Sequence, residues 1–204
     1  MSGNLKVGVL VSGSGTNLQA IIDAANEGLP IEIAHVVSSR PDAYGIERAK
    51  AAGIPVLVMN QGLYADPLAA DEMIADTLRA SGVEYVVMAG YMRMVSGVLL
   101  EAFPNRILNL HPALLPAFIG AHAIQDAFDA GVKVTGVTVH FANDEYDKGP
   151  IIAQRAVIVR EDDTVETLEE RIHEVEHEMY PQVLGWLADG RVSIDAAGKV
   201  HIKM

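Results

Sequence analysis

The stretch Val7-Gly8-Val9-Leu10-Val11-Ser12-Gly13-Ser14-Gly15-Thr16-Asn17 decides how this chain of 204 residues folds. Its first five residues form a short apolar run, which predicts a strand buried on both faces. A glycine-rich turn then leads into residues 18–27, which are apolar at helical spacing and end at Gly28. This order aims backbone N–H groups and the positive end of a helix dipole at an anion, although an ordinary strand-to-helix turn also fits.

The alternation of strands and helices continues beyond this stretch. Strands are predicted at residues 31–37, 54–59, 84–88, 106–110, 134–142 and 150–159, and helices at residues 43–52, 66–80, 98–103, 123–130 and 164–187. The longest helix is expected to be interrupted near Pro181, and residues 191–194 and 199–202 predict a terminal hairpin. Short connections favour an α/β fold: a Rossmann-like, open, mostly parallel twisted sheet flanked by helices, with antiparallel strands in the C-terminal part.

Composition excludes several classes of protein. The formal net charge of −12 argues against a nucleic-acid partner or an anionic membrane surface. The absence of Cys excludes disulfides, thiolate metal sites and a cysteine nucleophile. No apolar run reaches the roughly 20 residues of a membrane span, and residues 1–6 do not resemble a secretion signal. We therefore expect a cytoplasmic protein without a membrane partner.

Asn109 and His111 stand two residues apart at the end of a predicted strand, so their side chains point to the same face. An amide can donate a hydrogen bond to an oxygen that is gaining charge, and an imidazole can carry a proton near neutral pH. The pair fits half of an acyl-transfer site, or simply a strand end with two hydrogen-bonded polar residues. Ligands of parallel sheets bind beyond the carboxyl ends of the strands, where we expect this pair, the glycine-rich loop and residues 90–95.

A nucleotide-binding alternative rests on Gly13-x-Gly15, which matches part of the dinucleotide fingerprint although Leu18 stands at the third glycine position. Arg40 follows the second predicted strand and suits a 2′-phosphate, so an NADP-binding protein stays open. The histidines lack a tight ligand spacing, and we expect no metal. His140 is interpreted as a strand residue that supports the site.

Four motifs in order carry a family resemblance, at residues 12–20, 89–93, 109–116 and 144–150. Together they resemble the folate-dependent phosphoribosylglycinamide formyltransferases of the formyltransferase family, over nearly the whole chain. The resemblance implies transfer of the formyl group of 10-formyltetrahydrofolate, the cosubstrate, to the amine of glycinamide ribonucleotide in de novo purine biosynthesis, through a tetrahedral intermediate. It also implies small-molecule partners and a monomer or homodimer.

The resemblance assigns roles by position. Asn109, His111 and Asp147 fall on the family's catalytic trio, in which an ionised Asp147 is expected to raise the pKa of His111. The positions matching the ribonucleotide site, with Glu176 near the glycinamide end, are Gly15, Thr16, Asn17 and Glu176. The positions matching the folate site are Met92, Arg93, Met94, Val95, Asn109, Asn143, Asp144, Glu145, Tyr146 and Asp147. A single domain, residues 1–204, would comprise a nucleotide- and phosphate-binding half at residues 1–110 and a folate-binding, catalytic half at residues 111–204.

The sequence departs from the family pattern at two places. No Arg stands near Pro67, where such relatives often carry one, so an Arg–folate contact there is in doubt. Phe118-Ile119-Gly120 has Ile where Pro is common and is similar to formyltetrahydrofolate deformylase, the hydrolase alternative. The deformylase carries an N-terminal regulatory domain and lacks the loop at residues 12–17 in this form, so transfer is expected. The acidic charge disfavours a methionyl-tRNA formyltransferase.

Overall fold

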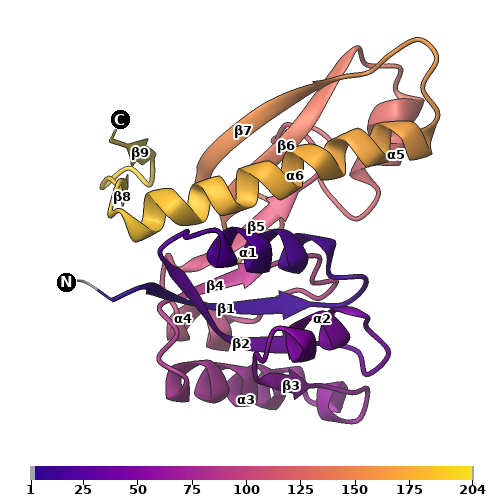
Figure 1. Cartoon of the computed structure of the whole chain (residues 1–204). Helices are drawn as coiled ribbons and strands as arrows, with labels where there is room; N and C mark the ends of the chain where they lie inside the picture. The colour runs from indigo at the N-terminus through magenta and orange to yellow at the C-terminus, as the bar shows by residue number, and fades with distance from the viewer. Residues whose placement is uncertain (1–2, 204) are drawn as a thin grey trace. The chain divides into compact units, whose positions relative to one another are not determined.

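The computed structural model describes residues 3–203; Met1 and Ser2, part of the N-terminal segment considered above, and Met204 lie outside the described residues. The strands are β1 (Leu5–Val11), β2 (Ile31–Ser38), β3 (Val56–Val58), β4 (Tyr85–Met88), β5 (Ile107–His111), β6 (Val134–Phe141), β7 (Ile151–Ile158), β8 (Val192–Ile194) and β9 (Val200–Ile202) (Figure 1). The helices are α1 (Thr16–Asn26), α2 (Gly45–Ala51), the 3₁₀ helix η1 (Leu63–Ala65), α3 (Pro67–Ala80), α4 (Gly97–Ala102), α5 (Ala123–Asp129) and α6 (Val165–Ala188). Seven strands form one sheet in the order β3-β2-β1-β4-β5-β6-β7, which confirms the predicted α/β fold.

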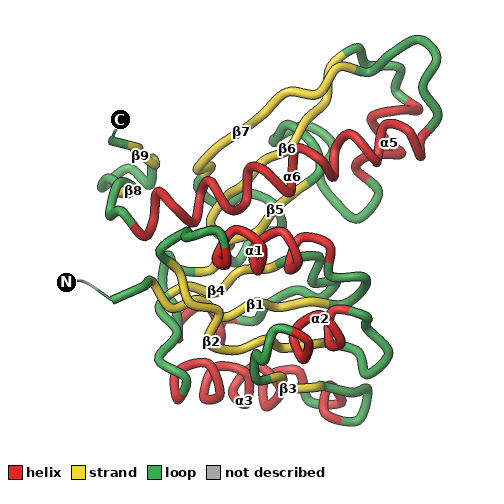
Figure 2. Tube along the Cα trace, viewed as in Figure 1, coloured by secondary structure: helices red, strands yellow, loops and turns green. Residues whose placement is uncertain are grey.

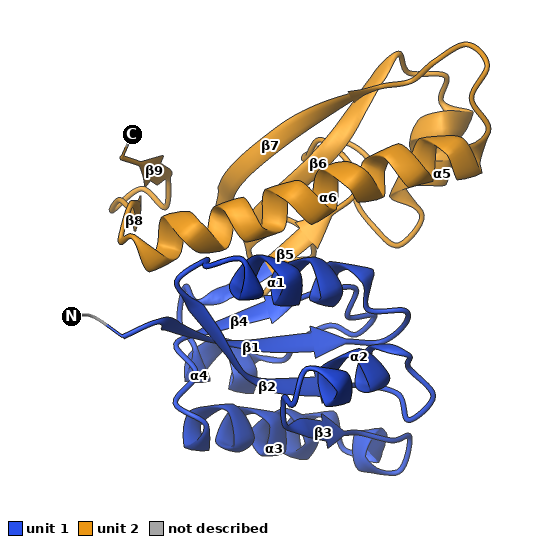
Figure 3. Cartoon of the chain, in the orientation of Figure 1, with its two compact units in different colours: residues 1–108 blue, residues 109–204 orange. Residues whose placement is uncertain are grey.

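The chain divides into two compact units, residues 1–108 and 109–204 (Figure 3). β5 contributes Ile107 and Leu108 to the first unit and Asn109 to His111 to the second. The division of one domain into binding and catalytic halves at residue 110 stays a prediction.

The first unit is built on parallel strands, as the alternating sequence predicts. β1 pairs in parallel with β2 and β4, and β2 with β3. Helix α1 contacts α2, α3 contacts α4, and the two pairs lie on opposite faces of the strands (Figure 2). The packing of α3 is tight, because a Cβ atom at Gly8 would lie 2.6 Å from Leu78 Cδ2. Asp66 caps α3 by accepting hydrogen bonds from Leu68 N and Ala69 N.

The second unit places α6 against an antiparallel pair. β6 pairs with β7 in antiparallel fashion, from Val134 opposite Ile158 to His140 opposite Ile151, and α6 contacts both strands. The expected interruption of this helix is wrong, since α6 runs through Pro181 without a break. Tyr180, Val183 and Leu184 are fully buried on either side of Pro181, so packing outweighs the one backbone hydrogen bond that proline cannot donate. β8 and β9 form the predicted terminal hairpin.

Candidate active site

The glycine-rich loop after β1 depends on Gly15. Its φ of 70° lies in the left-handed region, and it immediately precedes the first turn of α1. A Cβ atom at Gly15 would lie 2.7 Å from the Cα atom of Gly45 in α2. Only glycine fits this approach, which lets the backbone of the loop run close against a neighbouring helix. Thr16 is half-buried and Asn17 is buried directly after it.

Arg48 braces this loop, and sequence reasoning missed it. Its Nε donates to the carbonyl oxygen of Ser14 at 2.8 Å, and its Nη1 donates to Gln19 Oε1 at 3.0 Å. A guanidinium therefore stands beside the loop and adds positive charge to it. No spacing in the sequence relates Arg48 to Ser14, because the two residues come from different strand–helix units.

Ser12 joins three loops of the first unit. Its hydroxyl lies 2.5 Å from Ser39 Oγ after β2 and accepts a hydrogen bond from Met92 N after β4 at 2.8 Å. Ser12 N donates in turn to Gly90 O at 3.1 Å. The glycine-rich loop and residues 90–95 thus lie together at the carboxyl end of the parallel strands, as predicted.

The predicted folate segment at residues 92–95 is mostly open to solvent. Met92 is 78% and Met94 63% exposed, whereas Val95 is buried. Arg93 lies between the two methionines, and its guanidinium carbon stands 3.5 Å from the ring centroid of Tyr64. Apolar and cationic groups are therefore presented side by side.

The second unit brings together the predicted trio. Asn109 and His111 come from β5, and Asp147 comes from the connection between β6 and β7. His111 Nδ1 lies 3.4 Å from Asp147 Oδ2, and Asn109 Nδ2 donates to Asp147 Oδ1 at 3.3 Å. The side chains of His111 and Asp147 are each only 4% exposed. Residues separated along the chain thus share one buried polar site.

Burial changes the electrostatics that the sequence suggested. It lowers the pKa of His111 and outweighs the opposing effect of the Asp147 carboxylate, so the net direction is the reverse of the expected one. Burial raises the pKa of Asp147, but the neighbouring imidazoles of His140 and His111 and the backbone N–H of Gly120 together bring it below its usual value. Asp147 is accordingly an ionised carboxylate at neutral pH.

His140 fixes the orientation of Asn109. The Nδ1 atom of His140 lies 2.9 Å from the carbonyl oxygen of Phe141, which can only accept, so Nδ1 carries the proton. Nε2 is then an acceptor and takes a hydrogen bond from Asn109 Nδ2 at 3.2 Å. The other Nδ2 proton of Asn109 points at Asp147, which excludes a flipped amide with its oxygen against the carboxylate.

The segment containing Phe118 and Gly120 is hydrogen-bonded to the same groups. His111 Nε2 donates to Phe118 O at 2.7 Å, and Gly120 N donates to Asp147 Oδ2 at 3.1 Å. The sequence marked this segment only as a departure from the family pattern. The structure makes it a hydrogen-bonding partner of two members of the trio.

Thr138 and Gln154 hold the turn that follows β5, and sequence reasoning missed both. The Thr138 hydroxyl donates to Ala113 O at 2.7 Å and accepts from Leu115 N at 3.1 Å and from Gln154 Nε2 at 3.0 Å. Gln154 Nε2 also donates to Leu115 O at 2.8 Å. The hydroxyl uses its full hydrogen-bonding capacity, so the chain leaving His111 has one defined path.

The remaining predicted residues of the second unit differ in burial. Glu176 is 3% exposed on α6, where its carboxylate lies 2.9 Å from His173 Nδ1. The charge of Glu176 opposes the lowering of the His111 pKa by burial, although it is the smallest of the effects on that imidazole. Asn143 is half-buried, and the exposed residues of the same connection are Asp144, Glu145 and Tyr146.

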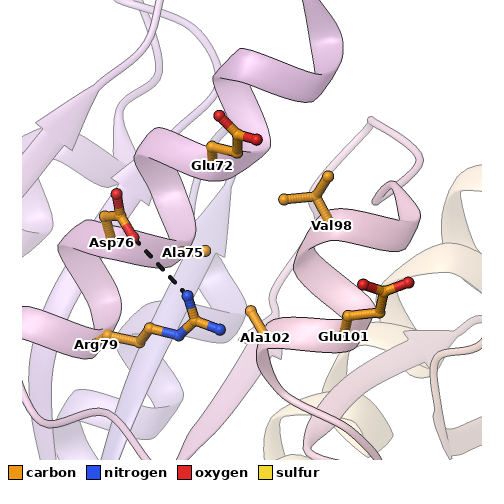
Figure 4. A pocket seen from close by; sticks show the side chains of 7 residues that line it. All are labelled: Glu72, Ala75, Asp76, Arg79, Val98, Glu101 and Ala102. Carbon is orange, nitrogen blue, oxygen red and sulfur yellow. Dashed lines mark ion pairs between the residues drawn. The ribbon is translucent and has the colours of Figure 1, made fainter.

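A separate cavity of about 500 Å³ lies in the first unit between α3 and α4 (Figure 4). Its lining residues are Glu72, Ala75, Asp76, Arg79, Val98, Glu101 and Ala102. It holds none of the predicted site residues, and Arg79 is paired there with Asp76 at 3.8 Å. This cavity is therefore not the place where the chemistry is assembled.

Comparison with known proteins gives concordant results. The family model described as formyl transferase matches residues 5–184. Phosphoribosylglycinamide formyltransferase from Haemophilus influenzae is 42% identical over 93% of this chain and 90% of its own length. The protein of the same name from Bacillus subtilis is 44% identical over 88% of this chain and 92% of its own length. The crystal structure of glycinamide ribonucleotide transformylase 1 from Symbiobacterium toebii matches with a TM-score of 0.96 at 50% identity, covering 100% of this chain and 96% of that one.

Proposed function

The chain belongs to the formyl transferase family, and from this premise we propose that it is an enzyme that transfers a formyl group from 10-formyltetrahydrofolate to the amine of glycinamide ribonucleotide. This step belongs to de novo purine biosynthesis. The observation that carries the proposal is the buried contact of Asp147 with Asn109 and His111, at 3.3 and 3.4 Å. An amide, an imidazole and a carboxylate in contact supply an oxyanion donor, a proton carrier and a charge that stabilises the protonated carrier, which together suit acyl transfer to an amine.

Asn109 and His111 act on the oxygen of the formyl group. When the amine attacks the formyl carbon, a carbon–nitrogen bond forms and negative charge develops on that oxygen in a tetrahedral intermediate. The amide N–H of Asn109 and the imidazole N–H of His111 stabilise this charge once the formyl oxygen replaces one of their present acceptors, which are His140 and Asp147 for Asn109 and the carbonyl oxygen of Phe118 for His111. Loss of one such donor raises the barrier by about 3 kcal/mol, which slows the reaction a hundredfold or more.

His111 and Asp147 handle the proton. The attacking amine loses a proton, and the departing N10 nitrogen of the folate gains one as its bond to the formyl carbon breaks. Burial keeps the pKa of His111 below its ordinary value, so the resting imidazole is neutral and can accept a proton, and Asp147 stabilises its cationic form while the oxygen carries charge.

Residues of the two units bind the substrates. Gly15, Thr16 and Asn17 hold the phosphate of the ribonucleotide at the first turn of α1, next to the positive charge of Arg48. The carboxylate of Glu176 binds near the glycinamide end.

We assign the folate cosubstrate, by the family resemblance, to residues of each unit. In the first unit these are the segment from Met92 to Val95. In the second unit they are Asn143, Asp144, Glu145 and Tyr146, together with Asn109 and Asp147. We infer small-molecule partners without nucleic acid, no metal, a cytoplasmic location, and a monomer or homodimer.

A two-substrate assay tests this function. Purified protein is incubated with 10-formyltetrahydrofolate, and tetrahydrofolate is followed with and without glycinamide ribonucleotide. We expect product only when the ribonucleotide is present, and none from the folded His111→Ala variant. Equal release without the ribonucleotide identifies a hydrolase of the deformylase type. Binding of NADPH instead of folate would refute both readings.

A further inference from the structure

Tyr64 has no role in the proposed chemistry, although burial and a hydrogen bond fix the position of its side chain. It lies in η1 and is 9% exposed. Its hydroxyl is 2.6 Å from the hydroxyl of Tyr91, which is 8% exposed. Burial raises the pKa of both phenols, so this bond joins two neutral hydroxyls at neutral pH. The ring of Tyr64 is therefore a fixed platform.

The guanidinium of Arg93 lies over this ring. Its guanidinium carbon is 3.5 Å from the centroid of the Tyr64 ring. The corresponding distance from the guanidinium carbon of Arg106 to the ring centroid of Tyr85 is 5.7 Å. The backbone beside it is anchored as well, since Met92 N donates to Ser12 Oγ at 2.8 Å. Both the main chain and the side chain of Arg93 are thus restrained by neighbours within the first unit.

The edge of the guanidinium nevertheless stays open. Within residues 3–203, Arg93 has no ion pair with a carboxylate. The nearby carboxylate of Asp71 is buried and accepts a hydrogen bond from Ser96 N at 2.6 Å. A stacked guanidinium uses its face on the ring and keeps its N–H groups in one plane, where a carboxylate accepts two parallel hydrogen bonds.

We propose that Tyr64 is a positioning residue, which holds Arg93 so that its open edge binds a carboxylate of the glutamyl tail of the folate cosubstrate. The flanking methionines, Met92 and Met94, are exposed and offer adaptable apolar contacts to the aromatic part of the same molecule. The ribonucleotide phosphate is assigned to the loop around Gly15, which leaves Arg93 for the other substrate. This inference rests on the proposed function. In this chain, which lacks an Arg near Pro67, it makes the paired tyrosine and arginine the determinant of tail recognition.

Binding measurements with two unreactive probes test the assignment. Folic acid carries the glutamate and pteroic acid lacks it, so the ratio of their dissociation constants isolates the carboxylate. By calorimetry we expect the wild-type protein to prefer folic acid, and Tyr64→Leu to weaken folic acid binding about fivefold while pteroic acid binding is unchanged. Tyr64→Phe, which keeps the ring face, is expected to lose less. In the Arg93→Ala background, Tyr64→Leu should have no further effect on folic acid binding.

Tyr85→Leu is the matched control, because it also removes a tyrosine ring beside an arginine of the first unit. It should leave the ratio unchanged even if it lowers the melting temperature. Equal losses for both probes in Tyr64→Leu, or an unchanged ratio, would overturn the assignment and leave the proposed function intact. A wild-type protein that binds neither probe would refute the folate-dependent function and this inference with it.

Discussion

Gly149→Ala is the substitution that most directly tests where Asp147 must stand. Gly149 follows Asp147 by two residues in the connection between β6 and β7. A Cβ atom there would overlap the carbonyl oxygen of Phe141 and lie 3.4 Å from His140 Nδ1. The φ of Gly149 lies outside the left-handed region, so the penalty comes from lack of space.

The size of the effect on catalysis depends on whether β6 or the connection that contains Gly149 moves to relieve this overlap. The obstructing carbonyl belongs to the backbone of β6, which is paired with β7 along its length. The connection must therefore shift, and Asp147 shifts with it, away from contacts at 3.3 and 3.4 Å with Asn109 and His111. A displacement of about 1 Å breaks these contacts and costs about a hundredfold in rate.

Steady-state kinetics measures the outcome. We expect kcat to fall about a hundredfold in Gly149→Ala, with a smaller change in the KM of the ribonucleotide, in protein whose fold is verified by circular dichroism. Gly97→Ala is the control, because a Cβ atom at this first residue of α4 meets no atom within 4 Å. A folded Gly149→Ala variant with wild-type kcat would show that the position of the Asp147 carboxylate does not matter for catalysis.

The other predictions concern the same two units. Asp147→Asn should lower kcat about a hundredfold. Because the carboxylate acts to raise the pKa of His111, its loss should also move the limb of the pH–rate profile that this imidazole sets to lower pH. An unaltered profile would show that Asp147 does not influence the pKa of His111. Gly15→Ala should destabilise the protein by about 2 kcal/mol through its positive φ, measured by urea unfolding, and raise the KM of the ribonucleotide more than that of the folate. The pKa of His173 is raised by its hydrogen bond to Glu176, so this pair adds stability that is complete below pH 6.5 and lost as pH rises through the folded pKa. The difference in melting temperature between wild type and His173→Gln should shrink over that rise, and a difference independent of pH would argue against the pair.

Periodicity predicted the elements of the fold because each carries its own pattern. The apolar runs of β1 and β4 and the spacing of α1 depend on which face is buried, and that is written in the local sequence. Pro181 shows the limit of such reasoning. Whether a proline ends a helix depends on the burial of its neighbours, which no local pattern contains.

The sequence predicted those parts of the candidate site whose arrangement depends only on residues close together along the chain. Asn109 and His111 share a face through strand parity, whereas the placement of Asp147 followed from family resemblance alone. Arg48 and Tyr64 could not be found in this way, because each acts on a segment distant along the chain and neither has a distinctive motif. The direction of the shift in the His111 pKa also escaped prediction, since it depends on how deeply the ring is buried.

The hydroxyl of Ser12 is one buried junction that three loops of the first unit share. Its oxygen accepts the amide hydrogen of Met92, and a single hydrogen from either hydroxyl joins Ser12 to Ser39. Alanine at residue 12 would remove both of these bonds and leave only the backbone bond from residue 12 to the carbonyl oxygen of Gly90. The loss of a single oxygen atom would then loosen two surface segments that are far from each other along the chain.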